Sequence, residues 1–196
     1  MTLFKQTGWR FVTSGGGEVD VGFSKFLYVA TQAGAFYVQK DGEKNIWRLP
    51  FIGAGAGAGF GVSAGGVVTL SMSLPCQWGG GFSIYRNPLR SSALSLDSFS
   101  GGFVAVCGGL TAGFATGGSF LFFGASEGLL AKVTALAAYV AGPAALGARI
   151  DAAVLACEGA GALWGTGETS ALAASATIIT GHIFNPQPAI PHETGD

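Results

Sequence analysis

Residues 52–74 read IGAGAGAGFGVSAGGVVTLSMSL and keep a strict two-residue period. One parity carries Ile, Ala, Phe, Val, Leu and Met, whereas the other is Gly or Ser for most of its length. This is the period of a β-strand, in which successive side chains point to opposite faces. We expect the Gly face either to bend tightly, as in a small barrel, or to let another surface approach the backbone closely.

Charge is scarce around this segment. It lies within a run of thirty-seven residues, 49–85, that lacks Asp, Glu, Lys and Arg, and a second such run covers residues 98–126. Charged residues form 11% of the chain, about half the usual share. With a mean hydropathy of +0.47, this composition predicts burial in an oligomer, in a partner or against lipid. The net charge of −1 and the lack of a basic cluster argue against nucleic-acid binding.

The pattern divides the chain into a mainly β part and a helical part. Residues 1–125 predict an antiparallel Gly-rich sheet, as a barrel or sandwich, with a hairpin turn at Asp41-Gly42. Residues 126–184 predict an Ala/Gly-rich helical hairpin packed on the same domain, its second helix covering about 144–163, followed by a last strand over 177–184. Residues 185–196 predict a loose, Pro-rich tail.

The sequence argues against a constitutive membrane span. Alternation and Gly content make residues 51–74 poor helix formers, and the predicted helices contain charges and Gly142-Pro143. An outer-membrane barrel would have a polar interior and aromatic girdles, whereas the second face here is Gly and Ser. The N-terminus shows no secretory signal. We expect cytoplasmic synthesis, with membrane association or export by a dedicated machine as the alternatives.

Two serines, Ser63 and Ser126, fit the Gly-x-Ser-x-Gly pattern of nucleophilic serines. Only Ser126 lies between a predicted strand and a predicted helix. Asp151 or Glu158 and then His182 follow it, an order that resembles a small cutinase-like esterase of the α/β-hydrolase class. The competing interpretation is that Ser126 caps the helix through its hydroxyl. We favour the cap and expect no enzymatic activity.

Metal and redox motifs are missing from the sequence. Cys76, Cys107 and Cys157 lack the close spacing of zinc or redox sites, so we expect reduced, mostly buried thiols. The only imidazoles are those of His182 and His192, far apart in sequence. We therefore expect neither a metal nor a cofactor.

Aromatic residues are the other candidate site. Phe120, Phe122 and Phe123 occupy both faces of one short segment, which predicts a strand buried on both sides or docked on a partner. Together with Trp164 they are our candidates for contact with lipid or a partner. Core packing is the competing interpretation for the phenylalanines, and local packing for the tryptophan.

Part of the chain resembles a known family. The segments QAGAFYVQKDG, residues 32–42, and GAGAGAGFG, residues 53–61, place a strand that ends in a polar turn before a Gly-alternating strand. Residues 25–74 are similar in this respect to the Gly-rich SYLF-type lipid-binding domains. The resemblance implies binding of membrane lipid and transfers no binding residue.

Our leading hypothesis is a non-enzymatic protein that associates with a membrane, a lipid or its own copies through uncharged apolar surface. One alternative is a secreted bacterial effector or pore-forming toxin whose hairpin, residues 129–163, inserts into a membrane. A second alternative is the serine esterase that uses Ser126. A third is a structural subunit of a larger assembly, in which paired uncharged strands bury the same surface.

Overall fold

The structure is a computed structural model of all 196 residues. The residues whose placement it describes are 5–22, 27–63, 66–68, 77–78, 82–90, 92–126 and 156–189. Side chains are described for a smaller set, namely residues 5–15, 31–57, 82–90, 92–109, 117–126, 156–164 and 177–189.

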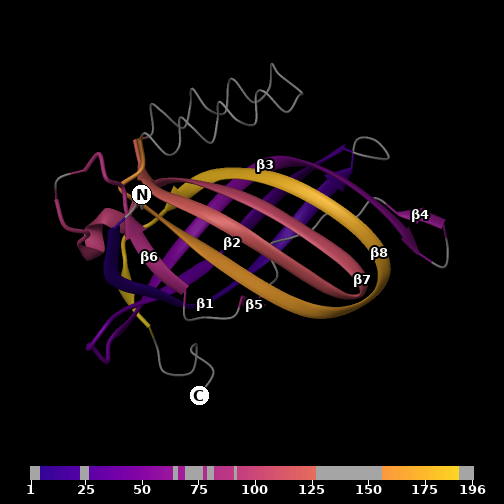
Figure 1. The fold of residues 1–196 in the computed structure, drawn as a ribbon. Coiled ribbons are helices and arrows are strands. Elements are labelled where there is room, and N and C mark those ends of the chain that lie inside the picture. Colours follow the sequence, from indigo (N-terminus) through magenta and orange to yellow (C-terminus); the bar gives the residue numbers. More distant parts are fainter. Residues whose placement is uncertain are drawn as a thin grey trace.

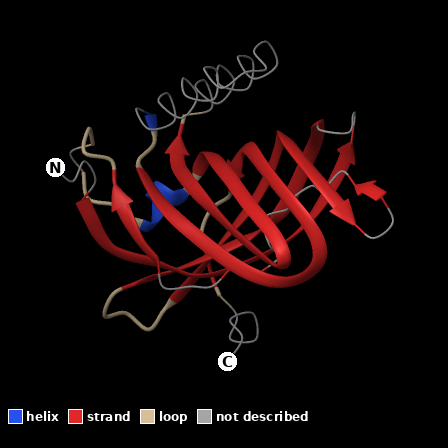
Figure 2. Cartoon of the chain, turned by 45° about the vertical axis from the view of Figure 1, so that its right-hand side comes forward, coloured by secondary structure: helices blue, strands red, loops and turns tan. Residues whose placement is uncertain are grey.

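These residues form a mainly antiparallel β-structure, as predicted (Figures 1 and 2). One short 3-10 helix, η1, precedes the longest strands. The elements in chain order are β1 (Lys5–Gly22), β2 (Leu27–Lys40), β3 (Ile46–Ser63), β4 (Gly66–Val68), β5 (Gln77–Trp78), β6 (Phe82–Arg86), η1 (Leu96–Phe99), β7 (Gly101–Ala125), β8 (Gly159–Ile183) and β9 (Gln187–Pro188).

The sheet closes on itself as a barrel. β1 pairs with β2, β2 with β3, β3 with β8, β8 with β6, and β6 with β1. Each of these pairings is antiparallel. Of the two alternatives that the sequence left open, a barrel or a sandwich, the structure shows the barrel.

β7 and β8 form a long antiparallel pair that is bent back on itself, visible at the right of Figure 1 as two nested U-shaped ribbons. The register of this pair shifts between Ala112 and Phe114. Before the shift, residues 101–112 of β7 pair with 172–183 of β8; after it, residues 114–123 pair with 159–168. Each strand therefore supplies two arms to the barrel wall.

The Gly face of β3 points into the barrel and the apolar face points out. Leu49 and Phe51 are buried in the core, and Gly53 shares their parity. A Cβ atom at Gly53 would lie 2.9 Å from the Phe103 ring, which is itself a core residue. On the other parity Ile52 is 54% exposed. The alternation predicted from the sequence is confirmed over residues 52–57, where side chains are described, and the barrel buries the face that has almost no side chains.

Glycine is required where β3 and β8 meet. Gly53 and Gly181 are paired, and a Cβ atom at Gly181 would lie 2.6 Å from the Gly53 Cα. A Cβ atom at Gly55 would lie 2.8 Å from the Ile178 carbonyl carbon, inside van der Waals contact. The close approach of another strand that the Gly pattern predicts is confirmed here.

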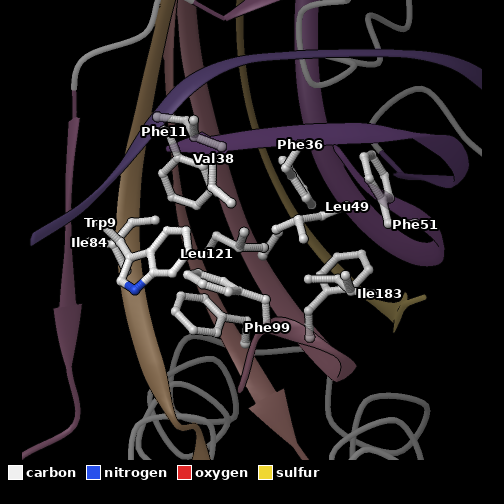
Figure 3. Close-up of a cluster of buried hydrophobic side chains, with 14 of the residues drawn as sticks. Trp9, Phe11, Phe36, Val38, Leu49, Phe51, Ile84, Phe99, Leu121 and Ile183 are labelled. Carbon is white, nitrogen blue, oxygen red and sulfur yellow. The ribbon is translucent and has the colours of Figure 1, made fainter. Parts of the chain in front are cut away.

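Aromatic side chains fill the end of the barrel that holds η1 (Figure 3). Phe36 stacks on Phe51 with ring centroids 4.3 Å apart, and both rings meet the edge or face of Phe103. Nearer η1, Phe99 stacks on Phe123 at 4.7 Å. Such pairs stabilise a core by about 0.5–1.5 kcal/mol beyond the burial of their area.

The predicted turn at Asp41-Gly42 is confirmed. It joins β2 to β3, and Gly42 has a φ of 81°, a left-handed conformation that Gly adopts at little cost. The Glu43 amide donates a hydrogen bond to the Lys40 carbonyl at 3.0 Å. The side chains of the same two residues form an ion pair at 3.2 Å.

The C-terminal part differs from the expected helical hairpin where it is described. Residues 127–155, which make up most of that hairpin, lie outside the described residues. Residues 159–163, expected at the end of its second helix, are strand, because all five pair with β7 and residues 159–161 also pair with β6. This tertiary pairing outweighs the local helical spacing. The strand predicted over 177–184 is the last part of β8, which ends at Ile183.

Residues 184–189, which follow β8, are hydrogen-bonded to β3. The Phe184 amide donates to the Pro50 carbonyl at 2.8 Å, and the Ala189 amide donates to the Ile46 carbonyl at 3.0 Å. Between them β9 pairs with Trp47 and Arg48. The first residues of the segment expected to be a loose tail thus continue the sheet, and residues 190–196 lie outside the described residues.

Candidate interaction surface: the outer wall of the barrel

The outward faces of β3, β7 and β8 form one uncharged surface, which we call the outer wall. Its members are residues of these strands that lie between the charged ends, have described side chains and have the parity opposite to that of the core. Arg48 and Glu168 have the same parity but lie at the start of β3 and at the bend of β8, and none of the members between these ends is Asp, Glu, Lys or Arg. They are Ile52, Ala54, Ala56, Val104, Val106, Gly108, Gly118, Phe120, Phe122, Ala160, Ala162, Trp164, Ile178, Thr180 and His182.

Two of the predicted contact residues are exposed on this wall. Phe120 is 63% exposed and Trp164 is 51% exposed. They lie on the paired arms of β7 and β8, where Trp164 is opposite Gly118 and Phe120 is opposite Ala162. A Cβ atom at Gly118 would lie 2.8 Å from the Trp164 ring, so the small residue makes room for the indole. The two aromatic side chains are thus neighbours on one face of the sheet.

The other two predicted contact residues are buried inside the chain. Phe123 points into the barrel and stacks on Phe99. Phe122 points outward but is buried in a small cluster with Val104 and Cys157. The prediction of a strand buried on both sides holds for residues 122 and 123, and Phe120 alone of the three phenylalanines is open to a partner.

Charged side chains gather at the end of the barrel that holds η1. We call this set the charged rim: Arg10, Lys40, Glu43, Arg48, Arg86, Arg90 and Glu158. Lys40 ends β2, Arg86 ends β6 and Glu158 immediately precedes β8. The rim is held together by polar contacts such as Arg10 Nη2 to Gln39 Oε1 at 2.6 Å and Arg48 Nη1 to Gln187 Oε1 at 3.3 Å.

The described residues of the esterase alternative, Ser126, Glu158 and His182, lie near this same end. Ser126 directly follows β7 and is exposed, and the helix that it would cap falls on residues outside the described set. His182 lies near the end of β8, where its ring centroid is 5.3 Å from that of Phe184. Glu158 forms an ion pair with Arg90, with Nε and Oε1 3.4 Å apart. Asp151 lies outside the described residues, and the esterase hypothesis stays a prediction.

A polar contact that sequence reasoning missed holds the start of β8. Asn87 is fully buried, and its side-chain amide donates to the Cys157 carbonyl at 2.9 Å. The Asn87 backbone amide donates to the Glu158 carbonyl at 3.0 Å, and Arg90 Nη2 donates to the Ala156 carbonyl at 2.9 Å. These partners are about seventy residues apart, and no local pattern connects them.

Burial raises the pKa of the Cys157 thiol from its ordinary value of 9.0 to about 11. The folded state therefore holds this proton more tightly than the unfolded chain, so its contribution to stability is complete below pH 9 and is lost toward pH 11. We expect the free energy of unfolding to fall by up to roughly 3 kcal/mol across this interval from this group alone.

The measurement is urea unfolding at several pH values between 8 and 11, for the parent and for Cys157→Ala. Because other groups titrate in both proteins, the difference between the two curves isolates this thiol. We expect a smaller loss of stability with pH in the variant. Equal slopes would contradict the assignment.

Comparison with known proteins adds no relative: no family model, no curated protein and no solved structure matches the chain. Within the described ranges, no three His, Cys, Asp or Glu residues are grouped closely enough to hold a metal ion. In the same part of the chain, no helix has the length and apolar character needed to cross a membrane.

Proposed function

We propose that this protein is a non-enzymatic barrel that associates with membrane lipid or with its own copies through the outer wall. The observation that carries the proposal is the exposure of Phe120 and Trp164, neighbours on the paired arms of β7 and β8, together with that of Ile52 on β3. Single exposed apolar residues are ordinary on soluble proteins, whereas large apolar side chains on one uncharged face are typical of an interaction site.

The energy available is sufficient for association. Complete burial of a Phe or Ile side chain is worth about 1.5–3 kcal/mol, and the larger Trp ring offers at least as much area. The three exposed side chains together therefore offer several kcal/mol. Because association also costs translational and rotational freedom, this corresponds to a modest affinity from these contacts alone.

The sequence resemblance supports the lipid arm of the proposal. The segments that resemble SYLF-type domains, residues 32–42 and 53–61, fall on β2 and β3, which pair with each other along the barrel.

The pore-forming alternative requires strand pairing to be broken in this fold. Residues 159–163 of the expected inserting hairpin are paired with β6 and β7, and insertion of the whole hairpin would break those pairs.

The first experiment measures the mass of the purified full chain by light scattering, with and without vesicles that carry a trapped dye. We expect either a closed oligomer or a vesicle-bound protein that leaves the dye inside. A monomer that ignores vesicles would contradict the proposal. Release of the dye would favour the pore-forming alternative over passive association.

A variant pair tests whether the outer wall is responsible. We expect the double substitution Phe120→Ser and Trp164→Ser to weaken association at least about tenfold, because two large apolar contacts are lost. Leu89→Ser is the matched control: Leu89 is 66% exposed but lies among the residues of the charged rim. An equal effect of the control would show that the contact lies elsewhere.

A further inference from the structure

The arms of the outer wall have a length that matches a lipid bilayer. The paired arms of β7 and β8 contain ten to twelve residues each, 101–112 with 172–183 and 114–123 with 159–168. A strand that crosses a membrane at about 45° needs about 9–11 residues. At about 3.3 Å per residue, arms of this length cover roughly 23–28 Å of depth, close to the apolar band of about 25 Å on membrane barrels.

Charge is placed at the two ends of these arms and not between them. At one end is the charged rim. At the other end, Glu168 lies where β8 bends between its two arms. Both arms of β7 are uncharged throughout, as is β3 from Leu49 to Ser63.

The outward side of the wall is apolar, as in a barrel that faces lipid. Outward positions carry Ile, Ala, Val, Phe and Trp; Val104 and Phe122 are covered by the cluster with Cys157, whereas Ile52, Phe120 and Trp164 are exposed. Inward positions away from the rim carry Gly and four buried polar residues, Ser14, Gln32, Ser119 and Thr177, beside the buried apolar residues Leu163 and Ile179. Along β3 and both arms of β8 the backbone is paired with neighbouring strands, and such pairing is what the hydrocarbon layer demands of a spanning wall.

The geometry points to the hydrocarbon layer of a lipid bilayer as the partner of the outer wall. The barrel spans this layer, with the charged rim at one headgroup region and the bend of β7 and β8 toward the other. Because the aromatic core fills the end beside the rim, the inserted barrel is sealed and is not an open channel. This inference rests on the proposed function. It specifies the partner, a lipid bilayer, and how deeply the barrel enters it.

The first test locates Trp164 in the bilayer. The full chain is reconstituted into phosphatidylcholine vesicles whose lipids carry bromine either near the headgroup or near the bilayer centre. Trp164→Phe is measured in parallel, so that the difference in quenched fluorescence belongs to Trp164. We expect the centre-brominated lipid to quench it most, because Trp164 lies near the middle of its arm.

The second test places a charge at mid-wall. Ala56 is exposed on β3, and Ala56→Arg is expected to lower the vesicle partition coefficient about thirtyfold or more. Leu89→Arg, at the charged rim, is expected to change it less than about threefold. Both variants must show the parent's circular dichroism in detergent, so that a lower partition coefficient does not reflect loss of the fold. The Trp164 quenching test uses neither variant and is therefore independent of this one.

The outcomes separate this inference from the proposed function. Vesicle binding with quenching greatest near the headgroup would overturn the span and leave surface association intact. An oligomer without vesicle binding would overturn the span and leave self-association intact. A monomer without vesicle binding would overturn both.

Discussion

We expect Gly55→Val to lower the free energy of unfolding by at least about 3 kcal/mol, enough to leave much of the protein unfolded at moderate temperature. A Cβ atom at this position would lie 2.8 Å from both the Ile178 carbonyl carbon and the Ile179 Cα, and it would overlap the Ile178 carbonyl oxygen. These are backbone atoms of β8. A flexible side chain could turn aside, but here the two strands must separate, and that breaks the pairing that closes the barrel.

Ala54→Val is the matched control for this prediction. It adds two methyl groups to the next outward position of the same strand, where the side chain is exposed. We expect a change within about 0.5 kcal/mol, because exposed strand positions accept β-branched residues. The measurement is urea unfolding of both variants followed by tryptophan fluorescence. Similar losses in the two variants would contradict the close approach of β3 and β8 at Gly55.

The two-residue period identified β3, but it did not determine which face is buried. A face of Ile, Ala and Phe opposite a face of Gly suggests, on hydrophobicity alone, that the apolar face is inside. The barrel reverses this, since Phe103 and Ile179 from other strands occupy the space in front of Gly53. That space is filled by residues fifty or more positions away in the sequence, so no local pattern contains the answer.

β8 was harder to predict for a related reason. Its first residues are Ala and Gly, which have little strand preference of their own. They are strand because Gly159 and Gly161 pack against aromatic rings: Cβ atoms there would collide with Phe123 and Phe11. The strand is selected by its neighbours in the barrel.

The candidate contact residues show the same limit. Alternation requires that Phe122 and Phe123 point to opposite faces, and the structure agrees. Alternation alone does not reveal that Phe122 is buried in a cluster that includes Cys157, whereas Phe120, on the same face two residues earlier, is exposed. Exposure along one face of a strand is a property of the whole fold, and every function considered for this chain depends on it.

The second large effect concerns the aromatic core. We expect Phe36→Ala to lower the free energy of unfolding by about 3–5 kcal/mol. Phe36 is buried, stacks on Phe51 at 4.3 Å, and meets Phe11 and Phe103 with ring centroids about 6 Å away. Removal of its ring leaves a cavity among rigid neighbours from several strands, which cannot collapse without moving the barrel wall.

Phe120→Ala removes the same side chain from the outer wall and should behave in the opposite way. Its ring is largely exposed, so we expect a change in the free energy of unfolding within about 0.5 kcal/mol. Its loss should instead weaken association with vesicles or with other copies. Unfolding and flotation measured on both variants therefore separate the inner and outer roles of phenylalanine in this chain. If Phe120→Ala costs as much stability as Phe36→Ala, the ring at position 120 is part of the folded core and the outer wall is not a free surface. If instead Phe120→Ala impairs only association with vesicles or other copies, the outer wall mediates association without contributing to the stability of the fold.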